Sequence, residues 1–259
     1  MLLESTVTVV TGAGRAIGRE IALQLAEDGA DVVLAARSVA GMEEVARLIC
    51  QLGRRALVVP MDVADETSVQ QGALQVLEEF GRVDLLVNNS GVGGPSKPLW
   101  EIGPQEWEDT FRVNVMGAYL VSRAFLPSMV AAGTGSVVFI GSVTGKRPLV
   151  NRTPYAASKL ALVGLVRTLS TEAGAHGIRV NLISPGAVEG ERLAWVLEQQ
   201  AAARGISVEE SRDAFASASP LHRLVTARDV ARAVAFLGSS HAAAITGEDM
   251  NVNAGLAMY

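Results

Sequence analysis

The chain has 259 residues, of which 49% are hydrophobic and 19% are charged, and its formal net charge is −5. This balance supports a large buried core and argues against disorder. Because the sequence has no basic run, no signal-peptide pattern and no apolar run as long as a membrane span, it predicts neither a nucleic-acid partner nor a membrane partner.

Short apolar, β-branched runs alternate with helical patterns along the whole chain. Strands are predicted at Thr6–Thr11, Asp31–Ala36, Ala56–Pro60, Val83–Asn88, Ser136–Gly141, Ile178–Ser184 and Asp249–Val252. Helices are predicted at residues 16–28, 39–52, 66–80, 106–132, 154–175 and 227–239, with a helical insertion at 191–217. Alternation with continuously apolar strands predicts a parallel sheet covered on both faces. The expected fold class is α/β, a single-domain Rossmann fold over residues 1–259 with a doubly wound parallel sheet of about seven strands.

The cysteine and histidine content of the sequence indicates the cellular compartment and whether a metal site is expected. The only cysteine, Cys50, has no partner for an internal disulfide, which predicts a reducing compartment, the cytoplasm. Cys50 also follows the apolar pattern of the second helix, so we expect it to be buried. The three histidines are scattered without ligand-like spacing, and no metal site is predicted.

A glycine-rich turn joins the first strand to the first helix. Its sequence is Thr-Gly-Ala-Gly-Arg-Ala-Ile-Gly over residues 11–18. Glycines let the backbone approach a pyrophosphate, and a helix N-terminus supplies N–H donors and a positive dipole end. The spacing is one residue longer than G-x-G-x-x-G, and a plain strand–helix turn is the alternative interpretation. The predicted dinucleotide-binding residues of this turn are Gly12, Gly14, Arg15, Ile17 and Gly18.

The end of the second predicted strand bears on cofactor choice. NAD sites usually carry a carboxylate there, on the ribose 2′-hydroxyl. Here Arg37 and Ser38 follow the strand, and Asp31 lies at its opposite end. An arginine is suited to a 2′-phosphate, and Arg15 of the glycine turn approaches the same region. The sequence therefore favours NADP(H), with NAD(H) possible if these arginines are merely solvated.

Tyr155 and Lys159 are four residues apart on a predicted helix, and so lie on one face of it. An ammonium group beside a phenol stabilises the phenolate and lowers the phenol pKa. Such a pair can exchange a proton with a carbonyl or alcohol oxygen. Taken alone, this spacing is more often a solvated helix face.

With these motifs in order, the chain resembles the short-chain dehydrogenase/reductase family along nearly its whole length. The glycine turn is similar to that family's T-G-x-x-x-G-x-G, with Ala16 in place of the middle glycine, and Asn88-Asn89-Ser90-Gly91 is similar to its N-N-A-G. The family's threonine beyond Pro185-Gly186 falls at Gly190. The resemblance implies further cofactor contacts at Asp62, Val63, Asn89, Gly91, Tyr155, Lys159, Pro185, Gly186 and Val188.

The resemblance also implies the chemistry, hydride transfer between a nicotinamide and a carbonyl or secondary alcohol. Tyr155 would act as the general acid/base, and Lys159 would lower its pKa and bind the nicotinamide ribose. Ser142 would hydrogen-bond the substrate oxygen, and Asn114 would hold a water that connects Lys159 to solvent.

The insertion at residues 191–219 resembles the segment that covers the substrate pocket in this family, so it is a candidate lid. Arg152, just before Tyr155, and Trp195 of the insertion are candidate substrate contacts. Arg147 and Arg192 are further candidates at the mouth. An anionic or strongly polar substrate is one hypothesis, and solvated surface charges are the alternative.

Three functions therefore remain open on sequence grounds. The first is a cytoplasmic NADP(H)-dependent ketoreductase or alcohol dehydrogenase acting on a small molecule. The second is a 3-oxoacyl-(acyl-carrier-protein) reductase, and the third is a binding protein that senses NADP(H) without turnover. The apolar C-terminal tail, as in similar family members, predicts a homotetramer or homodimer.

Overall fold

Seven parallel strands form one sheet in the computed structural model, which describes residues 1–259. Their spatial order is β3-β2-β1-β4-β5-β6-β7, the order of a doubly wound Rossmann sheet. The expected fold class is thereby confirmed. The strands are β1 Val7–Thr11, β2 Asp31–Ala36, β3 Ala56–Pro60, β4 Leu85–Asn88, β5 Gly135–Ile140, β6 Ile178–Pro185 and β7 Asp249–Val252.

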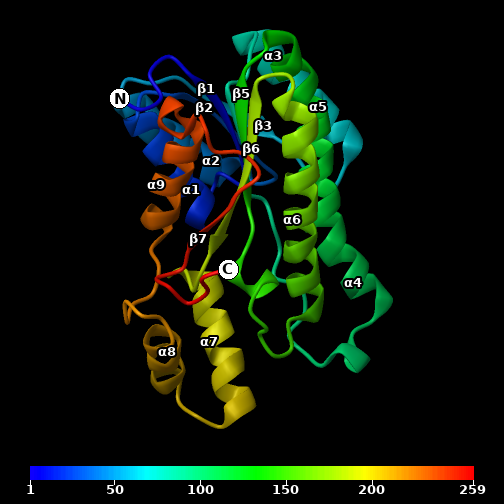
Figure 1. The fold of residues 1–259 in the computed structure, drawn as a ribbon, viewed down its shortest axis with the longest axis vertical. Coiled ribbons are helices and arrows are strands. Elements are labelled where there is room, and N and C mark those ends of the chain that lie inside the picture. Colours follow the sequence, from blue (N-terminus) through cyan, green and yellow to red (C-terminus); the bar gives the residue numbers. More distant parts are fainter.

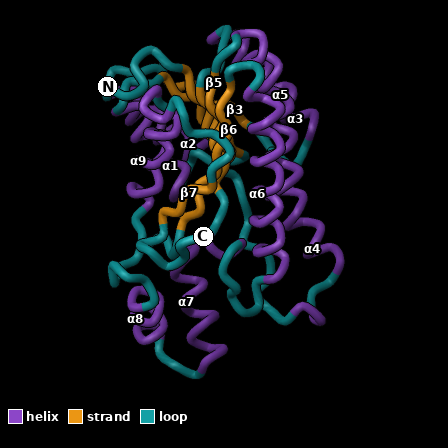
Figure 2. Tube along the Cα trace, viewed as in Figure 1, coloured by secondary structure: helices purple, strands orange, loops and turns teal.

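Helices cover both faces of this sheet (Figure 1). Helices α1, α2 and α9 pack on one face, and α3, α5 and α6 pack on the other. Helices α7 and α8 extend beyond the sheet, which is plainest in the trace of Figure 2. The bounds are α1 Ala16–Glu27, α2 Val39–Gln51, α3 Glu66–Phe80, α4 Pro104–Phe111, α5 Gly117–Ala132, α6 Thr153–Gly174, α7 Glu191–Arg204, α8 Val208–Ser217 and α9 Ala227–Gly238.

The two faces carry separate apolar clusters, because alternate side chains of each strand point to opposite sides. Every residue of β1 and β4 is buried, as expected for parallel strands covered on both faces. Val10 packs into the α1/α9 cluster and its neighbour Val9 into the α5/α6 cluster. The sheet is therefore a rigid platform for groups at its carboxyl edge.

Local sequence signals account for several helix ends. Asp65 caps α3 by accepting hydrogen bonds from the N–H groups of Thr67 and Ser68 at 2.8 and 3.1 Å. Thr226 and Asp229 cap α9 reciprocally. Helix α5 ends at Gly133, whose φ of 66° suits glycine.

The long helix expected at residues 106–132 is not a uniform α-helix. A π-helical segment, Arg112–Met116, separates α4 from α5 and contains the buried Asn114. Such π segments occur frequently at functional sites. The insertion at 191–217 likewise forms two helices rather than one.

Two further expectations need correction. By length and composition alone, the continuous helical stretch Pro104–Ala132 is long and apolar enough to cross a membrane, contrary to the sequence reading. One third of its apolar window is buried, and Val121 and Phe125 lie in the core against the sheet. Cys50 was expected to be buried but is exposed, because the buried face of α2 is formed by Met42, Val45 and Ile49.

Candidate active site

The candidate site lies at the carboxyl edge of the sheet, where β1 and β4 are neighbours and the chain order reverses. The glycine turn follows β1, and the Asn89–Gly91 segment follows β4. Thr11 ties these two segments together, since its hydroxyl accepts hydrogen bonds from the N–H groups of both Asn89 and Ser90 at 3.0 Å. The Asn89 amide in turn donates to the Thr11 carbonyl at 2.8 Å.

Close backbone packing defines the glycine turn. Gly12 has a φ of 66°, in the region that favours glycine. A Cβ on Gly18 would come within 2.1 Å of the Gly12 carbonyl oxygen, so no larger residue fits there. The turn leads into the N-terminus of α1, where the first backbone N–H groups have no partner within the helix. This arrangement fits a dinucleotide pyrophosphate.

Ala16 departs from the ideal turn. Its φ is 47°, so the methyl group that replaces the resembled family's glycine occupies the left-handed region. That conformation costs an L-residue about 1–2 kcal/mol. The methyl group is exposed, so no packing contact offsets this strain.

The groups expected to select the cofactor are solvent-facing. Arg37, Ser38 and Arg15 are all exposed at this edge. Asp31, at the other end of β2, pairs with Arg54 at 3.1 Å and is remote from these residues along the strand. Asp62 lies in the turn after β3, where its carboxylate accepts a hydrogen bond from the Ala64 N–H at 3.0 Å, and Val63 beside it is buried.

Tyr155 and Lys159 lie in the first turns of α6. The Lys159 ammonium is 5.9 Å from the centre of the Tyr155 ring. Lys159 is only 4% exposed and donates a hydrogen bond to the Ile140 carbonyl at the end of β5, at 2.7 Å. The β5 strand end therefore fixes the ammonium beside the phenol.

The electrostatic surroundings favour the phenolate. Burial by itself raises the pKa of Tyr155, but the charges of Lys159 and Arg192, the Ser142 hydroxyl and the charge of Arg152 together lower that pKa below its ordinary value. Burial also lowers the pKa of Lys159, against the opposing effect of the Tyr155 phenolate. Both shifts bring the pair closer to neutral pH, as acid–base catalysis requires.

Ser142 and Asn114 approach the site from other segments. Ser142 follows β5, and its hydroxyl accepts a hydrogen bond from the Thr144 N–H at 3.1 Å. The Asn114 side chain exchanges two hydrogen bonds with the backbone of Val92, at 2.8 and 3.0 Å, and donates a third to the Ser158 hydroxyl. Asn114 thus joins the loop after β4 to α6; its expected role in holding a water stays a prediction.

The remaining cofactor candidates lie after β6. Pro185 ends that strand, and a Cβ on Gly186 would come within 2.9 Å of Asn253. Val188 pairs with Val225 in an isolated parallel bridge that anchors this segment. Gly190, where the resembled family has threonine, has a φ of 135°. A threonine would be strained in that conformation.

Helix α7 closes the far side of the site. Its Arg192 donates to the Gly91 carbonyl at 2.6 Å, and Trp195 lies against Arg152, whose guanidinium carbon is 5.2 Å from the Trp195 ring centre. Arg152 is buried at the start of α6. The structure therefore brings both candidate substrate residues to the side of the site that holds Tyr155.

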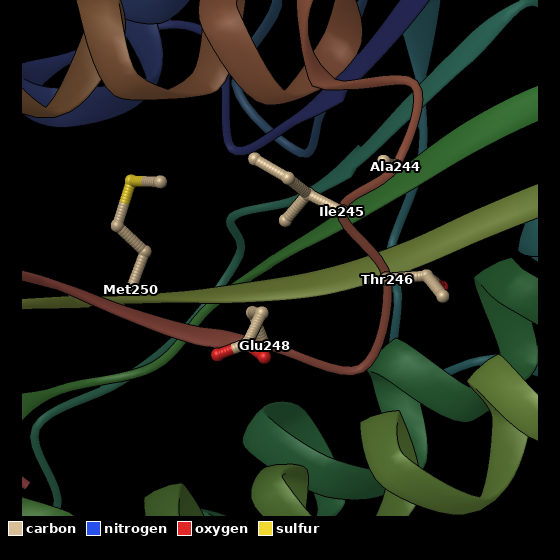
Figure 3. A pocket seen from close by; sticks show the side chains of 5 residues that line it. All are labelled: Ala244, Ile245, Thr246, Glu248 and Met250. Atoms are coloured by element: carbon tan, nitrogen blue, oxygen red, sulfur yellow. The ribbon is translucent and has the colours of Figure 1, made fainter.

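A separate surface pocket of about 380 Å³ lies at the amino-terminal end of β7 (Figure 3). Its lining residues are Ala244, Ile245, Thr246, Glu248 and Met250. None of these is among the candidate site residues, which gather at the opposite, carboxyl edge of the sheet.

Comparison with known proteins agrees with this geometry. Residues 12–257 match the family model described as enoyl-(acyl carrier protein) reductase. The chain is 34% identical to the short chain dehydrogenase/reductase astE of Aspergillus oryzae, over 99% of this chain and 96% of that protein. It is also 34% identical to the 3-oxoacyl-(acyl-carrier-protein) reductase FabG of Escherichia coli, over 100% of both.

Solved structures show the same architecture. NAD+-bound xylitol dehydrogenase superposes with a TM-score of 0.95 at 27% identity, covering 98% of this chain and 100% of that one. The actinorhodin polyketide ketoreductase with NADPH gives a TM-score of 0.94 at 35% identity, covering 98% of both chains. The chain belongs to the short-chain dehydrogenase/reductase family, and it is an oxidoreductase of that type.

Some contacts at the site escaped the sequence reading. The double acceptor role of Thr11, the Ser158 hydroxyl beneath Asn114 and the bond from Arg192 to Gly91 all join residues far apart in the chain. For the Thr11 contacts, the only signal in the sequence was that Thr11 and Asn89 each lie in a recognised motif. The π-helical segment that carries Asn114 follows from no pattern in the local sequence.

Proposed function

We propose that the protein is an NADP(H)-dependent carbonyl reductase or alcohol dehydrogenase with Tyr155 as its general acid/base. The observation that carries this proposal is the juxtaposition of the Tyr155 phenol with the buried Lys159 ammonium and the Ser142 hydroxyl, in surroundings that lower the phenol pKa. A ketoreductase among the similar structures and a 3-oxoacyl reductase among the relatives support the reductase direction.

A nicotinamide cofactor held by the glycine turn after β1 and by the Asn89–Gly91 segment would supply the hydride for the carbonyl carbon, or take it up in the reverse direction. Tyr155 transfers its proton to the carbonyl oxygen, so that the product is a secondary alcohol and the phenolate remains. Lys159 stabilises that phenolate, and Ser142 donates a hydrogen bond to the substrate oxygen as negative charge develops on it. Solvent then returns a proton to Tyr155.

The preference for NADP(H) rests on charge. Arg37 follows β2 in the position where a carboxylate would bind an unphosphorylated ribose, and Arg15 is exposed in the glycine turn. NAD(H) is the alternative, and a structural neighbour described as NAD+-bound keeps it open.

Two other functions compete with this proposal. Reduction of a 3-oxoacyl group on a carrier protein is favoured by the FabG relatives. A non-catalytic protein that senses NADP(H) needs the cofactor cleft but not the Tyr155–Lys159 pair. The presence of that pair favours an enzyme over a sensing protein.

The deciding experiment measures cofactor binding and turnover side by side. NADPH and NADH are each tested against a panel of neutral ketones, oxo acids, 3-oxoacyl thioesters and enoyl thioesters. Carbonyl-dependent oxidation of NADPH supports the proposal. Tight NADPH binding with no turnover of any compound supports the sensing protein instead, and turnover confined to enoyl thioesters contradicts carbonyl reduction.

We further propose a cytoplasmic homotetramer or homodimer with the α7–α8 segment as a lid. Large apolar side chains are exposed near α4 and α5 and at the C-terminus, namely Trp100, Met116, Tyr119, Met258 and Tyr259. Exposed apolar patches of this kind commonly mark interfaces. The mass in light scattering tests the assembly, and a monomer would contradict it.

A further inference from the structure

Arg152 is buried without a counter-charge. The residue is 3% exposed, and its Nη1 atom is enclosed with no hydrogen-bond partner. The charged groups that act on it are Tyr155 and another cation, Arg192, and no carboxylate is among them. Buried arginines are normally paired, because an isolated buried charge is costly.

Its position on α6 adds to that cost. Arg152 is the N-cap residue of α6, and no side chain caps the helix there. A cation at a helix N-terminus faces the positive end of the helix dipole, where an anion would be favoured. The preceding residue, Asn151, has a φ of 63°. Nothing in the local backbone therefore favours an arginine at this position.

The surroundings hold the guanidinium but leave its N–H groups unpaired. Its central carbon lies 5.1 Å from the centre of the Tyr155 ring and 5.2 Å from that of Trp195. Contacts with aromatic faces offset part of the burial cost. A Cβ on Gly93 would come within 2.9 Å of the Nη2 atom, so glycine at this position makes room for the group. The guanidinium is thus fixed beside the catalytic phenol.

We propose that Arg152 is the anion-binding residue of the substrate pocket, and that the enzyme acts on a small oxo acid or hydroxy acid whose carboxylate pairs with this guanidinium. The inference rests on the proposed carbonyl reductase function. A carboxylate matches the planar donor fork of arginine in a bidentate pair. It would also neutralise the charge buried at the α6 N-terminus.

The geometry restricts the size of the substrate. Because Arg152 and the phenol are side by side, the carboxylate and the reacting carbonyl must be separated by only a few bonds. A neutral 3-oxoacyl thioester would offer the guanidinium carbonyl dipoles but no counter-charge. If the substrate is an oxo acid, removing its negative charge should weaken binding. If it is a 3-oxoacyl thioester, a negative charge should give no advantage.

The first test uses the unmodified protein. Pyruvate, acetoacetate and levulinate are each compared with their methyl esters, which keep the carbonyl and remove the charge. At least one acid should be favoured over its ester by about 10- to 100-fold in kcat/KM, the range expected for a charge-assisted hydrogen-bonded pair. Equal kcat/KM for every acid and its ester would overturn the proposal.

Variants then assign the effect to Arg152. Arg152→Gln should raise KM for the favoured acid about 10- to 100-fold. Because Arg152 also lowers the pKa of Tyr155, any change in kcat should be shared by the acid and its ester, whereas the rise in KM should be confined to the acid. Arg152→Lys keeps the charge but not the fork, and should recover part of the loss. Arg167→Gln removes an exposed arginine from the same helix and should change neither substrate. Equal losses for acid and ester in Arg152→Gln would mean that Arg152 only supports Trp195 and Tyr155.

Binding separates failure of this inference from failure of the proposed function. Calorimetric titration with levulinate and with methyl levulinate, with and without NADPH, needs no turnover. If no carbonyl compound is reduced but levulinate binds more tightly than its ester and Arg152→Gln abolishes the difference, the anion site stands and the reductase proposal falls. If esters are reduced and bound as well as acids, the reductase proposal stands and the anion site falls.

Discussion

The two ends of the candidate site both carry arginines, but in opposite surroundings. At the end formed by the segments after β1 and β2, Arg15 and Arg37 are exposed to solvent. At the end formed by the N-terminus of α6, Arg152 is almost fully buried and lacks a counter-charge. An exposed arginine costs little and is therefore weak evidence for a ligand, whereas a buried unpaired one needs compensation.

Two residues that support the proposed chemistry, Lys159 and Asn114, are also buried. Lys159 and Asn114 are enclosed in hydrogen bonds to fixed backbone atoms, at 2.7 Å for Lys159 and 2.8 and 3.0 Å for Asn114. Low-dielectric surroundings strengthen their effect on Tyr155. We expect changes at Tyr155 and Lys159 to alter chemical rates, changes at Arg152 to alter substrate affinity and changes at Arg37 to alter cofactor affinity.

The largest effect is expected at Tyr155. Tyr155→Phe keeps the ring and removes the proton donor, so kcat should fall by about 10²- to 10⁴-fold while NADPH affinity changes little. Steady-state kinetics and a cofactor titration measure the two. Tyr119→Phe, an exposed tyrosine on α5, is the matched control. Near-normal turnover in Tyr155→Phe would contradict the mechanism.

The exposed end is tested by Arg37→Asp. This change removes the proposed phosphate contact and supplies a carboxylate for an unphosphorylated ribose, so KM for NADPH should rise about 10- to 100-fold and KM for NADH should fall. Arg47→Asp makes the same charge change on the exposed face of α2. An unmodified protein that already prefers NADH would show that Arg37 has no such role.

A smaller effect is expected at Arg192 of α7, which lies near the phenol. Arg192 lowers the pKa of Tyr155, so Arg192→Gln removes a cation and should raise that pKa. In alcohol oxidation the phenolate accepts the proton, and the rate rises as the phenol ionises. The rising limb of kcat/KM should therefore move to higher pH in Arg192→Gln. An unchanged limb would contradict this, and Arg204→Gln at the other end of α7 is the control.

The smallest effect concerns the turn between the two ends. Ala16→Gly relieves the positive φ, and the free energy of unfolding should increase by about 1 kcal/mol, since the strain removed exceeds the added chain entropy. Ala202→Gly, in the last turn of α7, should decrease it, by less than the roughly 1 kcal/mol that glycine costs in a helix interior. Denaturant titrations of both variants give the sign of the change in the free energy of unfolding. A loss of stability in both variants would contradict the proposal that Ala16 is strained.

Much of the fold and the candidate site followed from local pattern. Short apolar, β-branched runs predict the strands, because strands covered on both faces must be apolar. The residues of β1, β2 and β4 are indeed almost all buried. Tyr155 and Lys159 are predictable as a pair because helical spacing fixes their relation. The exposure of Cys50 was not predictable in this way, since an apolar pattern does not say where the buried face of α2 ends.

What the sequence determined by itself is therefore the class of fold, the order of its elements and the groups that share one helix or one turn, because these depend on neighbours in the chain. Only tertiary structure decided that the Ile140 carbonyl holds Lys159, that Asn114 lies in a π-helical segment against Val92, and that Arg152 is enclosed between Tyr155 and Trp195. Burial and pairing arise from segments brought together across the sheet edge, and no local pattern encodes the dielectric surroundings that they create.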